Sequence, residues 1–362
     1  MRRKKRRRIV SALRRTVFVL CFACAGAAPA SMRVFSVGSP WNVPIGPSST
    51  FVVTEPNVSR TYTGLSTWLL PDTTSVPIYT ASAADPLQSV LYNANAWNNV
   101  ANRMWLRSGN SAAVEAQILA TSKDVFPSPG NIYSSQSAGA WVLPSYYDKL
   151  VNPANPPARV RLPSGARPAA GTDGPLVAFQ PDGTVFEAYA AIVLSTGQVV
   201  ALQYHLTDAR GDGSGYANGT AASMLPIYAG NIRESELLAG SINHAMQILA
   251  PASLLDTQFV LPALAFDRGA LTETPPYSGH LPMGARLAIP PSVDLGSLKL
   301  TTAVGKMIAQ AAQKYGFIVA NRGGSGITIL VEASATALGV NKYDTNTNRD
   351  IQTIMTAVKT VR

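Results

Sequence analysis

Alternating apolar and polar residues give the clearest structural signal in this sequence, a β-hairpin. Residues 185–194 and 198–206 alternate with the period of two that strands require, and the intervening loop 195–197 ends in Gly197. Glycine accepts the left-handed conformation that a type I turn with a G1 bulge places at this position. The turn therefore fixes the register of the two predicted strands.

This register separates the hairpin into two faces of different character. One face places Glu187 opposite His205 and Tyr189 opposite Gln203. A slip by one residue would mix the two faces, so their clean separation supports the register. The other face pairs large with small apolar side chains: Phe186 with Leu206, Ala188 with Tyr204, Ala190 with Leu202, and Ile192 with Val200.

Similar short apolar runs recur along the rest of the chain, separated by turns rich in glycine and proline. Fewer segments have helical periodicity. This pattern favours a mainly β fold, which we expect to be an antiparallel β-sandwich or jelly roll with a few peripheral helices. Further strands are predicted at residues 242–249, 258–264, 285–289, 317–321 and 328–332, and helices at residues 111–121, 233–239, 302–314 and 348–358.

The first thirty residues have the composition of a secretory signal peptide. Residues 2–8 are all Lys or Arg, an apolar run covers residues 17–28, and residues 28–30 (Ala-Pro-Ala) have the pattern of a cleavage site. The apolar run is shorter than the ~20 residues that span a bilayer. We therefore expect a secreted or periplasmic mature protein, with an uncleaved membrane anchor as the alternative. The arginine pair at residues 14–15 leaves the twin-arginine route open.

Removal of residues 1–30 changes the charge of the protein. The whole chain has 30 Lys and Arg against 20 Asp and Glu, a formal net charge of +10. Nine of the basic residues and none of the acidic ones lie in residues 1–30, which leaves 21 basic against 20 acidic residues. The mature part is thus nearly neutral, and we expect no nucleic-acid partner. Both cysteines, Cys21 and Cys24, also lie in the leader, so residues 31–362 can form no disulfide.

We expect residues 31–362 to form a single β-sandwich domain. A proline-rich stretch at residues 151–175 has the composition of a loop and is a candidate domain boundary. No His-Glu-x-x-His, Gly-x-Ser-x-Gly or P-loop motif is present, and the three histidines are dispersed. The sequence therefore predicts neither a metal site nor a bound cofactor.

The polar face of the hairpin carries the candidate chemistry. Glu187 opposite His205 combines a carboxylate with an imidazole, and both groups serve as general acids or bases. Asp208 lies in the loop that follows this strand, which could place it near Glu187 as the second carboxylate that glycoside hydrolysis needs. Tyr189 and Gln203 offer directional hydrogen bonds to sugar hydroxyls. The alternative is a solvated outer face of an antiparallel sheet, which is normally polar.

Two further groups of residues have both a functional and a structural interpretation. Asp208 and Asp212 lie in a glycine-rich loop that fits a plain turn and also an oxygen-rich calcium loop. Five tryptophans fall between Trp41 and Trp141, and Trp105 among them is a candidate for stacking on a sugar ring. Tryptophans are more often part of a core.

Residues 229–245, with the sequence AGNIRESELLAGSINHA, resemble a segment of exported bacterial proteins of poorly described function. Similar segments follow in the same order at residues 284–294 and 313–319, so the resemblance covers roughly residues 175–335. It implies a secreted protein and carries no established activity. His244 is predicted to lie on an apolar strand face, which needs a reason. We take it as a candidate site residue, with a buried core histidine as the alternative.

A shorter resemblance involves the strand Gln203-Tyr204-His205. It is similar to the Gln-x-His strand of jelly-roll alginate lyases, in which the glutamine and histidine act at the uronate during β-elimination. The Arg-rich strand and the Tyr-Lys-Ala-Gly-x-Tyr strand of that family are not evident. The resemblance implies a polysaccharide lyase as one candidate function.

Together these features predict a secreted glycan-active enzyme, either a glycoside hydrolase or a polysaccharide lyase, that uses a polar cleft on a β-sheet face. Its partner would be a polysaccharide or cell-wall glycan, with no membrane contact after the signal peptide is removed. One alternative is a non-catalytic carbohydrate-binding or cell-surface protein that uses the same face. A structural exported protein is the other.

Processing after Ala30 is directly testable. Mass spectrometry of the exported protein should find Ser31 at the N-terminus, because the Ala-Pro-Ala pattern directly follows the apolar run. An intact Met1, or a lipid attached to Cys24, would contradict this expectation.

Overall fold

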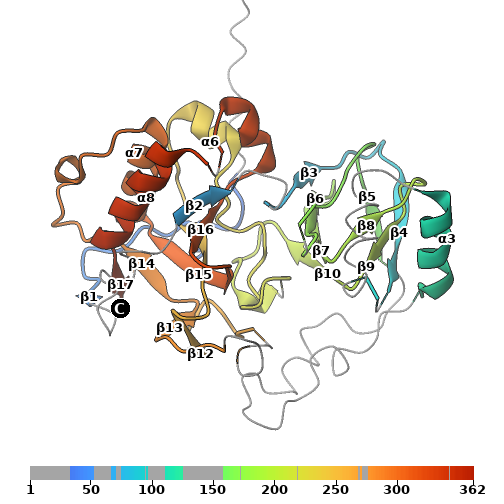
Figure 1. The fold of residues 1–362 in the computed structure, drawn as a ribbon, viewed down its shortest axis with the longest axis horizontal. Coiled ribbons are helices and arrows are strands. Elements are labelled where there is room, and N and C mark those ends of the chain that lie inside the picture. Colours follow the sequence, from blue (N-terminus) through green and yellow to red (C-terminus); the bar gives the residue numbers. More distant parts are fainter. Residues whose placement is uncertain are drawn as a thin grey trace, which may run out of the picture.

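The chain folds into two lobes, each built around β-sheets (Figure 1). The larger lobe carries three α-helices and the C-terminus, and the smaller lobe carries one α-helix at its outer end. The structure is a computed structural model. It describes residues 33–52, 67–70 (backbone only), 75–93, 95–96, 111–124, 158–171, 173–217, 219–267, 270, 276–341 and 343–362.

A seven-stranded mixed sheet forms the centre of the larger lobe, in the order β1-β17-β14-β15-β11-β16-β2. The pairs β11–β15 and β16–β2 are parallel, and the other neighbours are antiparallel. The strands are β1 (Phe51–Val52), β2 (Thr67–Leu70), β11 (Met246–Ala250), β14 (Arg286–Ala288), β15 (Phe317–Arg322), β16 (Ile327–Leu330) and β17 (Lys359–Val361).

Helices and a small ribbon complete the larger lobe. The helices α7 and α8 contact each other, and α8 also contacts β2. The α-helices are α6 (Glu234–Ala239), α7 (Ala303–Lys314) and α8 (Thr345–Ala357), and the 3₁₀ helices are η1 (Gly215–Ala217), η3 (Leu295–Leu298) and η4 (Ala333–Leu338). The parallel pair β12 (Leu255–Phe259) and β13 (Leu281–Met283) forms a separate two-stranded ribbon. None of the described helices is long and apolar enough to cross a bilayer.

The smaller lobe is built from two four-stranded sheets that enclose a common apolar core. One has the order β10-β7-β6-β3 and the other β5-β4-β9-β8. The helix α3 (Ala112–Thr121) covers a second small cluster on β8 and β9 through Val114 and Ile118. The strands are β3 (Ile78–Thr80), β4 (Leu87–Tyr92), β5 (Arg159–Arg161), β6 (Leu176–Phe179), β7 (Thr184–Tyr189), β8 (Ile192–Val193), β9 (Val199–Ala201) and β10 (Gln203–Asp208).

The strand β6 shows how the two lobes share their interior. All four of its side chains are buried, and alternate residues point to opposite faces of the sheet. Leu176 and Ala178 belong to the core of the smaller lobe. Val177 and Phe179 belong to the large core that extends through the larger lobe. The sheet β10-β7-β6-β3 therefore has an apolar core on each of its two faces.

The predicted hairpin register is confirmed. Glu187 pairs with His205 and Phe186 pairs with Leu206 in the β7–β10 ladder, and the same register continues into β8–β9. The hairpin bends at Ala190, whose φ is +50°, so its outer part joins the second sheet of the smaller lobe. Leu206, at the end of the apolar face, is 43% exposed.

The mainly β prediction is confirmed, whereas the antiparallel jelly roll is not, because five of the strand pairs are parallel. The proline-rich stretch 151–175 is not all loop, since β5 lies within it and pairs with β4 inside the smaller lobe. The predicted strand 242–249 begins later, at Met246. His244 therefore precedes the strand, and its predicted strand parity was wrong.

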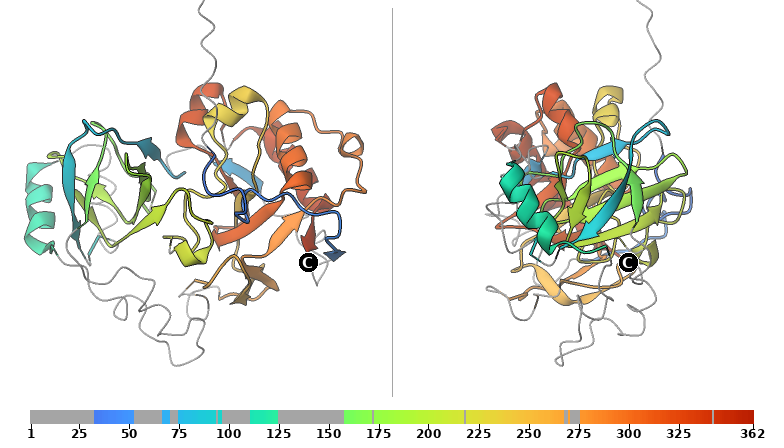
Figure 2. Two further views of the ribbon diagram at one scale, coloured as in Figure 1. Left: turned by 180° about the vertical axis from the view of Figure 1, so that it is seen from behind. Right: turned by 90° about the vertical axis from the view of Figure 1, so that its right-hand side faces the viewer.

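The segment of residues 33–45, here called the N-terminal strap, binds the loop after β10 and the residue before β11. Its backbone reaches the loop after β10, where the N–H of Phe35 donates to the carbonyl of Ala209. Further along, the Trp41 indole donates to the carbonyl of Gly213 at 2.7 Å, and the Trp41 carbonyl accepts from Ala245. Figure 2 shows the strap in blue, running from the lobe boundary across the larger lobe.

Asp350 on α8 fixes the start of α7 and provides a test of this packing. Its carboxylate accepts hydrogen bonds from the backbone N–H groups of Thr301 and Thr302 and from the Thr302 hydroxyl, at 2.7–3.0 Å. We expect Asp350→Ala to lower the free energy of unfolding by about 1–3 kcal/mol, because the partly buried donors at the start of α7 lose their acceptor. Denaturant titration measures this. The control Asp256→Ala should stay within ~0.5 kcal/mol, and an equal loss there would contradict the capping role.

Candidate functional site

Glu187 lies on β7 with no exposed surface, and its carboxylate is fully engaged. Its Oε1 accepts a hydrogen bond from the Thr207 hydroxyl at 3.1 Å. Its Oε2 accepts from the backbone N–H of Ile227 at 2.7 Å and from the hydroxyl and N–H of Thr220 at 3.1 and 3.3 Å. Burial raises the pKa of Glu187 to about 7, although these hydrogen bonds lower it. The carboxyl group therefore joins β7 to the segment of residues 219–228.

His205 lies opposite Glu187 on the neighbouring strand β10 and is 2% exposed. Burial lowers its pKa to about 3, so the imidazole is neutral at physiological pH. Its Nε2 accepts from the side-chain amide of Gln203, and its Nδ1 has no partner among the described residues. Glu187 and His205 are neighbours in the ladder, yet no hydrogen bond or ion pair connects the two described side chains.

The other residues predicted for the hairpin site lie apart from this pair. Asp208 is exposed, and its carboxylate accepts from the N–H and the Nε of Arg210 at 2.9 and 3.2 Å, as in a plain turn. Tyr189 is partly exposed and donates to Asp173 at 3.4 Å. Trp105 lies outside the described residues. The structure thus brings together Glu187, His205 and Gln203, and it buries them.

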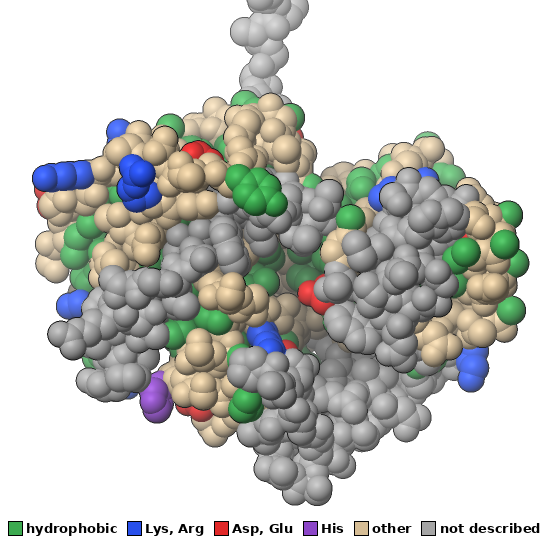
Figure 3. Space-filling view, viewed as in Figure 1, with side chains coloured by type: hydrophobic (Ala, Val, Ile, Leu, Met, Phe, Trp, Pro, Cys, Tyr) green, Lys and Arg blue, Asp and Glu red, His purple; other side chains and the backbone are tan. Residues whose placement is uncertain are grey.

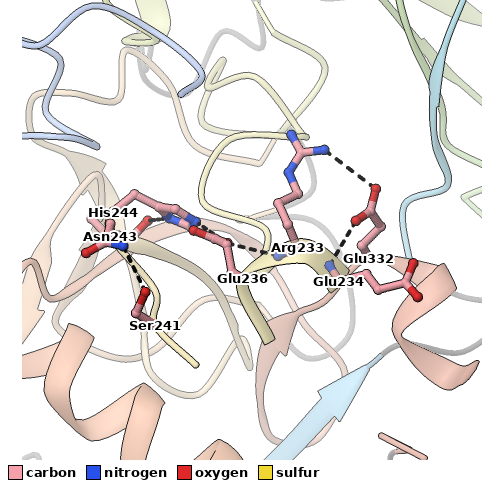
Figure 4. Close-up of polar contacts among 8 residues, drawn as sticks. Arg233, Glu234, Glu236, Ser241, Asn243, His244 and Glu332 are labelled. Carbon is pink, nitrogen blue, oxygen red and sulfur yellow. Dashed lines mark hydrogen bonds and ion pairs between the residues drawn. The ribbon is translucent and has the colours of Figure 1, made fainter. Parts of the chain in front are cut away.

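His244 belongs to a second cluster, formed by the segment that resembles exported proteins (Figure 4). Its Nε2 lies 3.0 Å from the Glu236 carboxylate, and its Nδ1 lies 2.9 Å from the carbonyl of Ala245. Each of the two ring nitrogens thus lies within hydrogen-bond distance of an oxygen. His244 therefore connects α6 to the start of β11 and leaves no ring nitrogen free.

Glu236 is the centre of this cluster and is 5% exposed. Its carboxylate also accepts from the backbone N–H of Arg233 at 3.0 Å, which caps the start of α6. Burial alone would raise the pKa of Glu236. The hydrogen bond and charge of His244, with the hydrogen bonds from the N–H groups of Arg233 and Asn243, outweigh burial and lower it. Glu236 is consequently ionised, as its partners require.

Arg233 extends from the same helix start to the boundary between the lobes. Its guanidinium lies over the ring of Phe179 on β6, 5.5 Å from the ring centroid, and 3.7 Å from the carboxylate of Glu332. Glu332 also accepts from the backbone N–H of Glu234 at 3.0 Å. The side chains of Arg233 and Glu332 are 18% and 20% exposed. They are thus more accessible than either Glu187 or His205.

A continuous set of contacts joins the two clusters. The Tyr228 hydroxyl lies 3.0 Å from the hydroxyl of Thr207, which also binds Glu187. The rings of Tyr228 and Phe179 pack edge to face, with their centroids 5.3 Å apart. The Arg233 guanidinium lies over the Phe179 ring. We call this set of five residues, Glu187, Thr207, Tyr228, Phe179 and Arg233, the polar seam. Figure 3 shows a hollow between the two lobes, with acidic and basic side chains at its rim.

The sequence contained signals for part of this second cluster. Arg233 and Glu236 both belong to the segment 229–245, but neither was identified as a site residue. Glu332 ends a predicted strand and is far from both in the chain, so no local pattern connects it to them. Among the described residues, no group of three His, Cys, Asp or Glu side chains is placed to hold a metal ion.

Comparisons with known proteins gave no relative for this chain. A scan against protein-family models found no match. A search of curated proteins also found none. No solved structure matches the fold. The function must therefore be argued from the site.

The buried Glu187 predicts a specific dependence of stability on pH. Its folded-state pKa of about 7 lies above the ordinary value of 4.5. The contribution of Glu187 to stability is therefore complete below pH 4.5 and is lost as the pH rises to about 7. Relative to Glu187→Gln, the free energy of unfolding of the wild type should fall by about 3 kcal/mol over this range.

Denaturant titrations of both proteins between pH 4 and pH 8 measure this difference. Glutamine retains an oxygen for Ile227 and Thr220 and an amide group for the Thr207 hydroxyl, so the variant should fold. A difference between the two proteins that does not change with pH would contradict the assignment.

Proposed function

We propose that the protein is an exported glycan-binding protein that performs no acid–base catalysis at the hairpin face. The observation that carries this proposal is that Glu187 and His205 are both buried, with Glu187 hydrogen-bonded to Thr220 and Ile227. Each oxygen of Glu187 already accepts hydrogen bonds from the protein itself. A catalytic acid or base must instead reach the proton that it transfers.

The two catalytic alternatives agree less well with the geometry. Glycoside hydrolysis needs two carboxyl groups that flank the scissile bond. Asp208 is engaged with Arg210 on the surface, while Glu187 is buried. A lyase that acts through a Gln-x-His strand needs Gln203 and His205 free to contact a uronate. Here these two side chains bind each other inside the protein.

The partly exposed groups at the lobe boundary favour binding. Arg233 provides hydrogen-bond donors, and Glu332 provides acceptors, on opposite sides of a short gap. Sugar hydroxyls both donate and accept, so they match such a pair. Ligands also bind preferentially where two structural units meet, and the hollow between the lobes is such a place. The basic leader followed by an apolar run supports export, which would give access to extracellular glycans.

A polysaccharide panel tests this proposal when binding and turnover are measured on the same samples. We expect the protein to bind at least one glycan without releasing reducing ends or unsaturated uronates. Glu187→Gln should change the affinity by less than about 2-fold, because the residue is buried away from the boundary. Turnover that disappears in Glu187→Gln would restore the enzyme hypothesis. Failure to bind any glycan on the panel would contradict the binding proposal.

A further inference from the structure

Arg233 has fewer partners than a buried guanidinium normally has. Five N–H donors are available, and the side chain is only 18% exposed. The only partner of these N–H groups in the described part of the chain is Glu332, at 3.7 Å, which is too long for a direct hydrogen bond. The ring of Phe179 lies under the guanidinium, 5.5 Å from the ring centroid, and offers its N–H groups no oxygen or nitrogen acceptor. This edge is therefore available to a ligand.

Asn231 is a second and independent sign of a missing partner. The residue is 1% exposed, yet neither its Oδ1 nor its Nδ2 has a hydrogen-bond partner among the described residues. An unsatisfied buried amide costs about 1–3 kcal/mol and is rare in folded proteins. Such a group is retained more readily when a ligand completes its hydrogen bonds.

The backbone directs Asn231 and Arg233 toward the same side. Ile232, between them, forms a bridge with Val331, and its N–H and carbonyl bind the strand end around that residue. Side chains of such extended backbone alternate. Ile232 is fully buried in the large core, so its two neighbours point away from that core. Glu332 follows Val331 and contacts Arg233 there.

The charges around these residues select the class of ligand. Three carboxylates, from Glu234, Glu236 and Glu332, lie beside the Arg233 guanidinium and the His244 imidazole. The local charge is therefore negative, which disfavours a uronate or another anion. The donors of Arg233, the acceptor of Glu332 and the amide of Asn231 fit a neutral group that both donates and accepts.

We propose that Asn231, Arg233 and Glu332 form a seat for two neighbouring hydroxyl groups of an uncharged sugar. This proposal rests on the glycan-binding function proposed above and names its site and its ligand class. The seat lies at the lobe boundary, where the partly exposed Arg233 and Glu332 side chains give a ligand its first contacts. The amide of Asn231 completes the set.

The experiment combines stability and affinity on the full mature protein. Asn231→Leu replaces an unsatisfied amide with an apolar group of similar size. We expect it to raise the melting temperature and to weaken the binding of neutral oligosaccharides of glucose, mannose or N-acetylglucosamine about 10-fold or more. Arg233→Lys should weaken binding similarly, because lysine lacks the planar fork of donors. Glu234→Gln is the control and should change affinity by less than about 2-fold.

The possible outcomes distinguish failure of the proposed sugar site from failure of the proposed glycan-binding function. If the wild type binds neutral glycans and Asn231→Leu binds them equally well, the seat is wrong and the glycan-binding function stands. If the wild type binds oligogalacturonate in preference to neutral sugars, the charge argument is overturned. A fall in the melting temperature of Asn231→Leu would show that the amide is satisfied inside the protein, and would overturn the proposal. Binding to no sugar at all would overturn both proposals.

Discussion

The buried carboxyl group of Glu187 holds the two lobes in their relation to each other. It lies on a strand of the smaller lobe and accepts hydrogen bonds from residues that lead into the larger one, Thr220 and Ile227. Burying a carboxyl group is expensive unless its hydrogen bonds are made. The segment 219–228 provides hydrogen-bond donors that the buried Glu187 carboxylate needs. Arg233 and His244 follow this segment in the chain.

This arrangement gives the polar seam its character. Tyr228 and Phe179 supply aromatic surfaces from the two sides, and Thr207 connects them to Glu187. Chains of buried hydrogen bonds specify one arrangement of the surrounding elements, because a partly satisfied network is costly. At its far end the seam is incomplete, and only there are the charged side chains partly exposed. The seam thus runs from the fully buried Glu187 to the partly exposed Arg233.

The sequence predicted the hairpin well because its signals are local. A turn length, a glycine and an alternation of period two are sufficient to pair Glu187 with His205. Whether that polar face meets water is a non-local property. A segment that follows in the chain covers it, and alternation cannot show this. The register behind the expected open cleft was correct, but the segment 219–228, which binds Glu187, was not foreseen.

The errors around His244 and the large sheet have a similar origin. Periodicity placed His244 within a strand, but α6 ends at Gly240 and the strand starts only at Met246. The contact with Glu236 depends on that turn. The parallel pairing of β11 with β15 connects segments separated by the β12–β13 ribbon and α7, so no local pattern predicts it. Glu332 joins Arg233 for the same long-range reason.

The N-terminal strap has a consequence for the order in which the chain can fold. The strap is the first described part of the chain, yet it binds Ala209, Gly213 and Ala245, which come much later in the sequence. A chain made from its N-terminus presents the strap long before these partners. Loop closure over such a separation is slow. The strap can therefore dock only after the chain through residue 245 is present, so its contacts form late in folding.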